Sequence, residues 1–522
     1  MPLAWDSEAD VVVVGFGGAG ACAALEAARA GASVVALDRF AGGGATAMSG
    51  GVVYAGGGTF VQHAAGVPDT VDDMVAYLRE EVGDAVSDET LRRFCAESAD
   101  MIDWLAEAGV PFDSSVCPYK TSYPSNQYYL YYSGSENAWP FRSVATPAPR
   151  GHRTHARGTS GRVFFAALAS AARAAGVHVA RQTAVTRLIM EDGRVVGVEC
   201  RTLKSRWHGI LHQYATKPGL YVPGFARILH RRITELESTH GRVVRIRARR
   251  GVVLAAGGFV NNREMMRTHA PGFRGGLPLG TQGDDGVGIR LGESVGGVTD
   301  RMNKVSAWRF LTPPSALIRG ILVDQSGARF VDESAYGAAI GERLVRDHGG
   351  RAWLLVDERI LADARQQVRT ETLWFQRLSA EYLLRSSVRG ATLGEVARKA
   401  GIDPAGLTAT VASYGRGEDQ FGKHSDLVAP LAGPYALIDC SYGPRLAYPC
   451  PMLTLGGLVV DEGTGQVLDA DGAGIPGLYA AGRNAVGICS NSYVSGLSLA
   501  DCVFSGRRAG KHASGADNSE MI

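Results

Sequence analysis

A glycine-rich turn at Gly15–Gly20 constrains the fold of this chain more than any other feature, because it follows a run of β-branched residues directly. That run, Asp10–Val14, is short and apolar, as in a buried parallel strand, and the Ala- and Leu-rich stretch Ala21–Gly31 predicts a helix. A second strand is expected at Ser33–Leu37, ending at the acid Asp38. Strand, glycines, helix, strand and acid in this order form the βαβ unit that binds a dinucleotide.

Each part of this unit has a separate physical task. Gly15 makes the tight turn, Gly17 lets the backbone approach a pyrophosphate, and Gly20 lets helix and strand pack closely. The N-terminus of the helix offers free N–H groups and the positive end of its dipole to the phosphates. An acid at the end of the second strand can accept hydrogen bonds from a ribose. Dinucleotide contacts are therefore expected from Gly15, Gly17, Gly18, Ala19, Gly20, Asp38 and Arg39.

Length and composition narrow the class of protein. A chain of 522 residues suggests two domains, or one large domain with an insertion. The net charge of +2 does not favour nucleic acid as a partner, and no apolar run reaches the ~18 residues needed to span a bilayer. The N-terminus enters a strand at once, without the pattern of a signal peptide, so we expect a cytoplasmic protein. The eight scattered cysteines form no CxxC motif, which predicts reduced, buried thiols and no metal site.

The glycine motif alone does not separate FAD from NAD, and four further segments do. They are the loop Ala41–Gly51, the strand Gly251–Phe259, the run Gly283–Gly288, and the strand Pro476–Arg483 that leads into Ser490–Gly510. Together with Val467–Gly472, these segments resemble the fumarate reductase/succinate dehydrogenase flavoprotein superfamily over nearly the whole chain. The resemblance implies an α/β fold, with a discontinuous Rossmann-like FAD-binding domain at 1–298 and 440–522. An inserted α+β cap, the catalytic domain, is expected at 299–439.

The resemblance also implies roles for particular residues. The loop after the ribose acid would contact the diphosphate and flavin, and Val185 would meet the adenine by its backbone. Arg483 and a helix starting near Ser495–Ser498 would face the flavin pyrimidine, where the positive end of the helix dipole stabilises charge that develops on reduction. The FAD contacts implied beyond the glycine turn are Thr46, Ser49, Gly50, Gly51, Val185, Gly257, Asp285, Gly482, Arg483, Ser498 and Leu499.

Within the expected cap, Arg319–Val331 has a strand pattern interrupted by a turn at Gln325–Gly327, and Thr392–Ala400 predicts a helix. A basic segment lies outside the cap, between Arg201 and Thr234. It contains seven Lys or Arg residues and no acid, interleaved with Trp207 and other aromatic residues. One interpretation is a solvated basic loop, and the other is a peripheral contact with anionic lipid through 201–234.

Two tyrosines replace arginines that fumarate reductases use for their dicarboxylate. The first follows Arg329-Phe-Val-Asp-Glu as Tyr336, and the second stands in Asn491-Ser-Tyr493-Val-Ser495. This exchange argues against a dianionic substrate and for a neutral carbonyl compound. With Leu130–Glu136 and Pro147–His152, these residues resemble the 3-ketosteroid dehydrogenases, and among them the Δ4-(5α) type. The Δ1 type is the alternative, followed by a reductase of another unsaturated carbonyl compound and by a flavin-binding protein without dehydrogenase chemistry.

The resemblance implies removal of a proton from C4 and of a hydride from C5 of a 3-ketosteroid to flavin N5, in steroid degradation. Tyr336, Tyr493 and Ser495 would jointly remove the proton and polarise the carbonyl, with either tyrosine as the base. The helix N-terminus would favour a phenolate at Tyr493, and the backbone N–H of Leu497 would hold the 3-keto oxygen. The aromatic stretch Tyr128–Tyr132 is expected either in the pocket wall or in the core. The sequence contains no haem or iron–sulfur motif, so the electron acceptor would be external.

Overall fold

The computed structural model describes residues 4–203, 207, 209, 212, 223–443 and 448–515. The predicted βαβ unit is present as β1 (Ser7–Val14), α1 (Gly18–Arg29) and β2 (Val34–Asp38). Strands β1 and β2 pair in parallel, with Val11 opposite Val34. The helix begins three residues earlier than its apolar pattern indicates, because the backbone already turns at the glycines.

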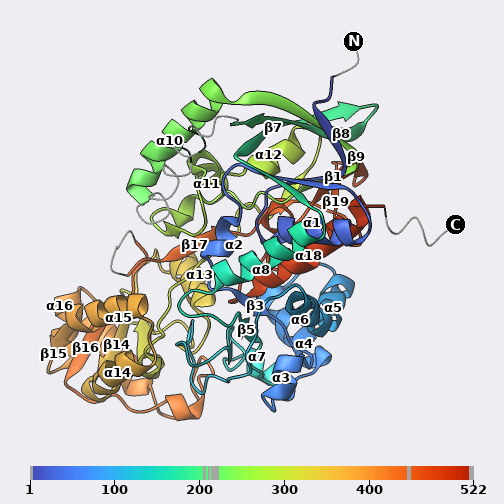
Figure 1. Cartoon of the computed structure of the whole chain (residues 1–522). Helices are drawn as coiled ribbons and strands as arrows, with labels where there is room; N and C mark the ends of the chain where they lie inside the picture. Colours follow the sequence, from blue (N-terminus) through green and yellow to red (C-terminus); the bar gives the residue numbers. More distant parts are fainter. Residues whose placement is uncertain are drawn as a thin grey trace.

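The main sheet has eight strands and draws on both ends of the chain (Figure 1). Its order is β19-β20-β9-β1-β2-β6, and β7 and β8 extend it because β8 also pairs with β9. The C-terminal strand β20 lies parallel to β9, with Ala480 opposite Leu254. The FAD-binding part is therefore discontinuous in sequence. The bounds are β6 His178–Arg181, β7 Thr183–Glu191, β8 Arg194–Thr202, β9 Arg242–Leu254, β19 Gln466–Leu468 and β20 Gly474–Ala480.

Three helices pack together against one face of this sheet: α1, α8 (Gly161–Ala174) and α18 (Leu497–Ala513) (Figure 1). Below them in Figure 1 lie α3 to α7, beside a small sheet of order β3-β5-β4. Further bounds are α2 Gly44–Met48, β3 Val52–Tyr54, α3 Phe60–Ala64, α4 Val71–Val82, α5 Asp88–Ala96, α6 Ser98–Glu107, β4 Leu130–Tyr131, α7 Phe141–Val144, β5 Gly151–Arg153, α10 Pro223–His240, α11 Arg263–His269 and α12 Val287–Glu293.

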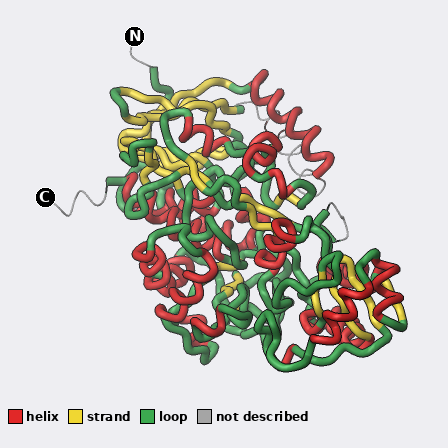
Figure 2. Tube along the Cα trace, turned by 180° about the vertical axis from the view of Figure 1, so that it is seen from behind, coloured by secondary structure: helices red, strands yellow, loops and turns green. Residues whose placement is uncertain are grey.

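The cap forms a separate lobe, seen at the lower left of Figure 1 and the lower right of Figure 2. Its antiparallel sheet has the order β13-β14-β16-β15, and its hydrophobic core is distinct from those of the main sheet. This confirms the α+β character of the insertion. The bounds are β13 Ile321–Val323, α13 Gly337–Asp347, β14 Trp353–Asp357, α14 Glu358–Thr370, α15 Trp374–Ser386, β15 Val388–Gly390, α16 Leu393–Ala400, α17 Pro404–Ser413 and β16 Tyr435–Asp439.

Local predictions within the cap agree with the structure. The expected turn is closed by a hydrogen bond from the N–H of Gly327 to the carbonyl of Asp324, 3.1 Å long. Helix α16 begins after Thr392, whose side chain caps the N–H of Glu395. Short strands connect the cap to the rest of the protein: β10 and β12 pair with β17, and β11 pairs with β18. Because these small sheets combine segments from both sides of the cap, the exact domain boundaries stay a prediction. These strands are β10 Leu277–Pro278, β11 Thr299–Asp300, β12 Val305–Ala307, β17 Pro451–Thr454 and β18 Gly457–Leu458.

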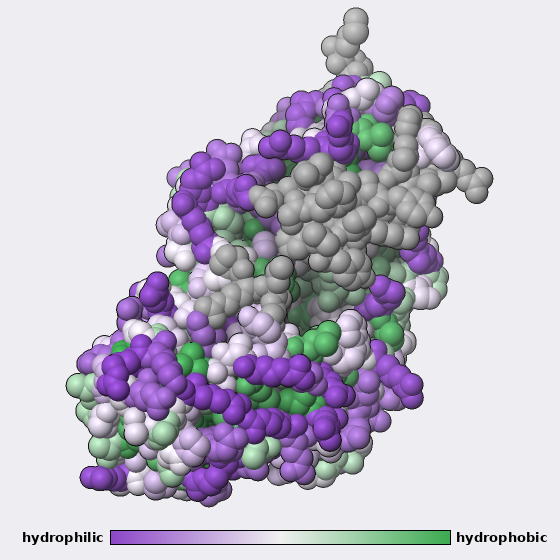
Figure 3. All heavy atoms as spheres, turned by 90° about the vertical axis from the view of Figure 1, so that its left-hand side faces the viewer, coloured by the Kyte–Doolittle hydropathy of each residue, from purple (hydrophilic) through white to green (hydrophobic). Residues whose placement is uncertain are grey.

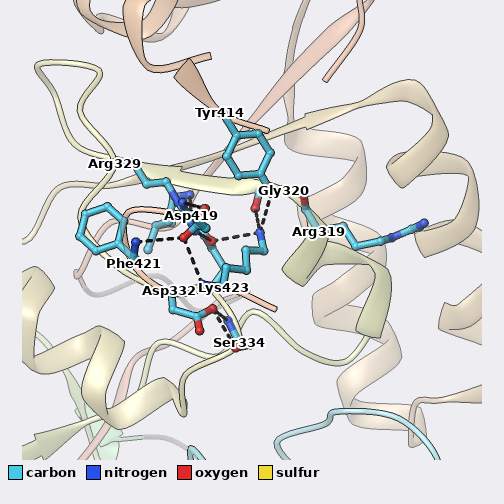
Figure 4. A network of polar contacts seen from close by, with 12 residues as sticks. Arg319, Gly320, Arg329, Asp332, Ser334, Tyr414, Asp419, Phe421 and Lys423 are labelled. Atoms are coloured by element: carbon cyan, nitrogen blue, oxygen red, sulfur yellow. Dashed lines mark hydrogen bonds and ion pairs between the residues drawn. The ribbon is translucent and has the colours of Figure 1, made fainter. Parts of the chain in front are cut away.

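A buried ionic network anchors the cap segment that leads to Tyr336 (Figure 4). The fully buried carboxylate of Glu333 lies 2.7 Å from Arg329 and 3.0 Å from the ammonium group of Lys423. Arg329 also pairs with Asp419. Glu333 is the carboxylate that both cations share, so its removal would leave the buried ammonium group of Lys423 without its ion-pair partner.

No helix in the described part of the chain has the length and apolar character needed to span a bilayer. All eight cysteines are free thiols, and seven of them are buried.

We predict that Gly341→Ala destabilises the joint between the cap and the FAD-binding part. Gly341 lies in α13 against β12, and a Cβ atom there would overlap the carbonyl oxygen of Ala307. Overpacking of this kind costs about 1–3 kcal/mol. In the control Gly394→Ala, on α16, the new Cβ meets only the mobile end of Arg398, at 3.3 Å. That variant should be neutral or gain up to ~1 kcal/mol of helix propensity. Thermal unfolding measures both, and equal midpoints would contradict the prediction.

Candidate active site

A cavity of about 2450 Å³ runs from the glycine turn, past the loop after β2, to the cap. It brings together side chains from the main sheet, the last helix and the cap, and its wall contains most of the residues that the sequence analysis selected. Those residues are Gly15, Gly17, Gly18, Ala19, Asp38, Arg39, Thr46, Ser49, Gly50, Gly51, Val185, Gly257, Asp285, Tyr336, Arg483, Tyr493, Ser495, Ser498 and Leu499. Gly20, Gly482 and Leu497 lie behind this wall.

The glycine turn has the geometry of a phosphate cradle. Gly15 has a φ of +95° and lies so close to Ala255 that a side chain would clash. A Cβ atom at Gly17 would meet no protein atom nearer than 3.8 Å, so the space beside it is open to the cavity. A Cβ at Gly20 would overlap the carbonyl oxygen of Gly15, as expected of the residue where helix and strand pack closest. The N-terminus of α1 thus faces open space that suits a pyrophosphate.

The loop after β2 is shaped by its own hydroxyl groups. The N–H of Gly18 donates to the Thr46 hydroxyl over 3.0 Å, which ties the loop to the start of α1. The Ser49 hydroxyl donates to the carbonyl of Thr46 and accepts from the N–H of Gly51. Small side chains and a folded-back loop keep this part of the cavity narrow enough to hold an extended cofactor.

Asp38 and Arg39 stand at the end of β2 as predicted. The carboxylate of Asp38 accepts hydrogen bonds from the backbone of Phe16 and Phe40, 3.0 and 2.8 Å long, while burial raises its pKa above the usual value. Arg39 pairs with Asp285 at 3.1 Å and with Glu237 of α10 at 2.8 Å. The carboxylates of Glu237 and Asp285 therefore balance the charge of Arg39, and these ion pairs hold the three side chains in place at the rim of the cavity.

At the other end of the sheet, Arg483 enters the cavity from the segment after β20. One nitrogen of its guanidinium, Nη2, lies 2.6 Å from the carboxylate of Asp284, and the other, Nη1, is buried without a hydrogen-bond partner among the described residues. The sequence analysis selected Asp285 for this region and missed Asp284. Two adjacent aspartates look equivalent in the sequence, so the sequence does not show which of them faces the arginine. The free Nη1 and the first turn of α18 are the donors expected around a flavin pyrimidine.

The two predicted tyrosines meet at the junction of the cap and the last helix. Their ring centroids are 6.3 Å apart, although Tyr336 precedes α13 in the cap and Tyr493 precedes α18. Trp308 stacks on Tyr493 with centroids 5.1 Å apart, and Phe310 packs edge-on against Tyr336 at 5.7 Å. Ser495 lines the cavity with both tyrosines, and its hydroxyl lies 3.1 Å from that of Tyr131. The two phenols and the Ser495 hydroxyl thus share one part of the cavity inside an aromatic wall.

One expectation at this end is wrong, and another meets an opposing effect. Burial raises the pKa of Tyr493, which opposes the expected phenolate there. The pKa of Tyr336 is raised for the same reason. The N–H of Leu497 donates to the carbonyl of Val494 over 3.1 Å, and Leu497 is fully buried behind the cavity. It therefore lacks a free donor for a substrate carbonyl.

Of the two alternatives for the aromatic stretch Tyr128–Tyr132, the structure favours the core. Residues 128–132 do not line the cavity, and Leu130 and Tyr131 belong to the core. Trp308, Phe310 and Phe375 line it instead, together with Tyr123. The available signal was the Trp308-Arg-Phe310 triplet at the start of the cap, which sequence reasoning did not use.

Comparison with known proteins agrees with the geometry. A family model described as an FAD binding domain matches residues 10–497. The 3-oxo-5-alpha-steroid 4-dehydrogenase of Comamonas testosteroni is 39% identical over 506 residues, covering 92% of this chain and 93% of that protein. The 3-oxosteroid 1-dehydrogenase of Mycobacterium tuberculosis (strain ATCC 25618 / H37Rv) is 28% identical, with 93% of this chain and 94% of that protein covered.

The crystal structure of 3-ketosteroid-Δ4-(5α)-dehydrogenase from Rhodococcus jostii RHA1, in complex with 4-androstene-3,17-dione, matches with a TM-score of 0.82. The two sequences are 33% identical, and 98% of each chain is covered. The cofactor is FAD, and the protein is an oxidoreductase acting on CH–CH groups. The chain belongs to the FAD-binding flavoprotein family and, within it, to the 3-ketosteroid dehydrogenases.

Proposed function

We propose that this protein introduces the C4–C5 double bond into 3-keto-5α-steroids, next to the 3-keto group. The observation that carries the proposal is the pairing of Tyr336 with Tyr493 at the cavity wall, 6.3 Å apart and enclosed by aromatic rings. A phenol can donate a hydrogen bond to a neutral ketone. Unlike an arginine, it carries no positive charge that would favour the binding of a carboxylate. The relatives named above as acting at the 4-position support this regiochemistry over the Δ1 alternative.

The residues divide the proton chemistry between them. Tyr493 lines the cavity, and because burial keeps its phenol protonated, its O–H can donate to the 3-keto oxygen and polarise it. Tyr336 then takes the proton from C4 while its own phenolic proton passes to Ser495, so no lasting phenolate forms. Ser495 gives its hydroxyl proton to water in the cavity that it lines. FAD, when bound, accepts the hydride that leaves C5. An external acceptor reoxidises it.

We predict that Tyr336→Phe and Tyr493→Phe each lower kcat by roughly 10²–10⁴-fold, the range typical for groups that move a proton. FAD should stay bound, since neither hydroxyl belongs to the cradle. Ser495→Ala should cost less, because a serine that relays a proton can be replaced by water. Tyr479→Phe, in β20 and outside the cavity lining, is the control and should leave turnover unchanged. Assays with a 3-keto-5α-steroid in solution and an artificial acceptor measure this. Near wild-type turnover in both Phe variants, with chemistry rate-limiting, would exclude the mechanism.

The product from a saturated 3-ketosteroid distinguishes the two regiochemistries. A 4-ene is expected, and a 1-ene would identify the Δ1 alternative.

We predict that Gly17→Val gives a folded but colourless protein. A Cβ atom at this position meets no protein atom nearer than 3.8 Å, so the fold should accept the valine. The valine side chain would occupy the space proposed for the pyrophosphate and so prevent FAD from binding. Absorbance of the purified protein measures bound flavin, and circular dichroism checks the fold. A yellow Gly17→Val protein would show that the cofactor does not pass this glycine.

We also propose that the basic segment 201–234 makes a peripheral contact with anionic lipid. Within it, residues 204–206, 208, 210–211 and 213–222 lie outside the described residues. Trp207 and the arginines Arg231 and Arg232 are described and exposed, which supports the proposal. Flotation with anionic vesicles should carry the protein upward, and salt should release it. A protein that stays at the bottom of the gradient would leave this segment as a solvated loop.

A further inference from the structure

Helix α15 separates the cavity from solvent and carries a different kind of surface on each side. Phe375, Gln376 and Ser379 line the cavity. On the other side, three large apolar residues spaced by four lie in solvent: Trp374, Leu378 and Tyr382, with 75%, 64% and 50% of their surface exposed. Residues four apart share one face of a helix, so these three form a continuous patch, the α15 stripe. Large exposed apolar patches of this kind usually mark an interaction site.

Arginines surround the α15 stripe. Arg377 and Arg385 both reach the only acid of α15, Glu381, at 2.8 and 3.6 Å. Arg369, exposed at the end of α14, adds a third positive charge beside the same carboxylate. The surface around the stripe is therefore positively charged while its centre is apolar. Figure 3 looks onto the side of the molecule where the cap lies and shows apolar areas set among hydrophilic ones.

We propose that the α15 stripe docks on a bilayer that contains anionic lipid, and that the steroid passes from the bilayer beside α15 into the cavity. Tryptophan and tyrosine favour the boundary between headgroups and acyl chains, and arginines beside them bind lipid phosphates. The route rests on the proposed function, since an apolar steroid partitions into membranes. A second copy of this chain is a poorer occupant, because a two-fold interface would bring the arginines of one stripe against those of the other.

The first experiment measures binding to vesicles of equimolar phosphatidylcholine and phosphatidylglycerol. The double variant Trp374→Ser/Leu378→Ser removes the apolar centre of the stripe. It should lower the partition coefficient about tenfold or more, because the free energy of transferring two apolar side chains from water into the bilayer is lost. Phe60→Ser removes an exposed aromatic residue from α3, far from the stripe in sequence, and should leave binding unchanged. Equal binding by the wild type and the double variant would overturn the proposal. So would a double variant that loses self-association in sedimentation without losing flotation.

The second experiment separates this surface from the basic segment 201–234. Brominated acyl chains quench only tryptophans that enter the bilayer. Trp374→Phe should remove quenching that remains in Trp207→Phe, whose site in the basic segment is 67% exposed. Quenching that is unchanged by Trp374→Phe and lost in Trp207→Phe would place the lipid contact on the basic segment alone and overturn the proposal for α15.

The third experiment tests the route of the substrate. With a 3-keto-5α-steroid delivered in the vesicles, the double variant should lose about tenfold in kcat/KM, in proportion to its weaker docking. With the steroid dissolved in cyclodextrin it should match the wild type, because neither residue lines the cavity. An equal change under both conditions would overturn the route. A wild type that binds vesicles through α15 but oxidises no 3-ketosteroid would refute the proposed function and leave the lipid contact standing.

Discussion

The contact between α1 and α18 determines where every other part of the site lies. Two glycines of α18, Gly506 and Gly510, lie against the carbonyl oxygens of Ala19 and Ala23, so close that any side chain would force the helices apart. Helix α1 starts at the glycine turn, and α18 starts just after Tyr493. The close approach of their backbones therefore fixes the separation between the end of the cavity that suits a pyrophosphate and the end that carries the tyrosines.

The cap completes this arrangement from the opposite side. Tyr336 stands at the start of α13, and Gly341, one turn further, lets that helix rest on the backbone of β12. Behind Tyr336, the network around Glu333 and Lys423 ties its segment to the rest of the cap. The two tyrosines thus come from separately built parts and meet only if the cap sits correctly. The catalysis proposed for this pair would depend on the position of the cap as much as on either hydroxyl group.

Local patterns predicted the parts of the structure that local physics determines. Glycines behind an apolar strand, an acid at the end of β2 and the helix expected at Thr392–Ala400 each depend on a few neighbouring residues, so the sequence reveals them. The same reasoning failed where a residue outside the local pattern determines the hydrogen bonding. The amide of Leu497 looked free at the start of a helix, but the turn at Val494 uses it. For residues 128–132 the sequence left the pocket wall and the core as alternatives, and the burial of Tyr131 behind Ser495 decides for the core.

The tyrosine pair also explains how such a cavity can prefer a neutral ketone to a dicarboxylate. The rings packed against the two phenols are those of Trp308 and Phe310, which carry no charge. The nearby guanidinium of Arg483 is held by Asp284, so its charge is largely balanced by the protein. A carboxylate buried beside these rings would lose its hydration without gaining a counter-ion, and that loss is large. A ketone loses far less hydration free energy on burial, and one hydrogen bond from a phenol replaces the hydrogen bond that its carbonyl oxygen accepted from water. The burial that raises the pKa of both tyrosines keeps them protonated in the resting enzyme, which is the state in which Tyr493 can donate to the carbonyl.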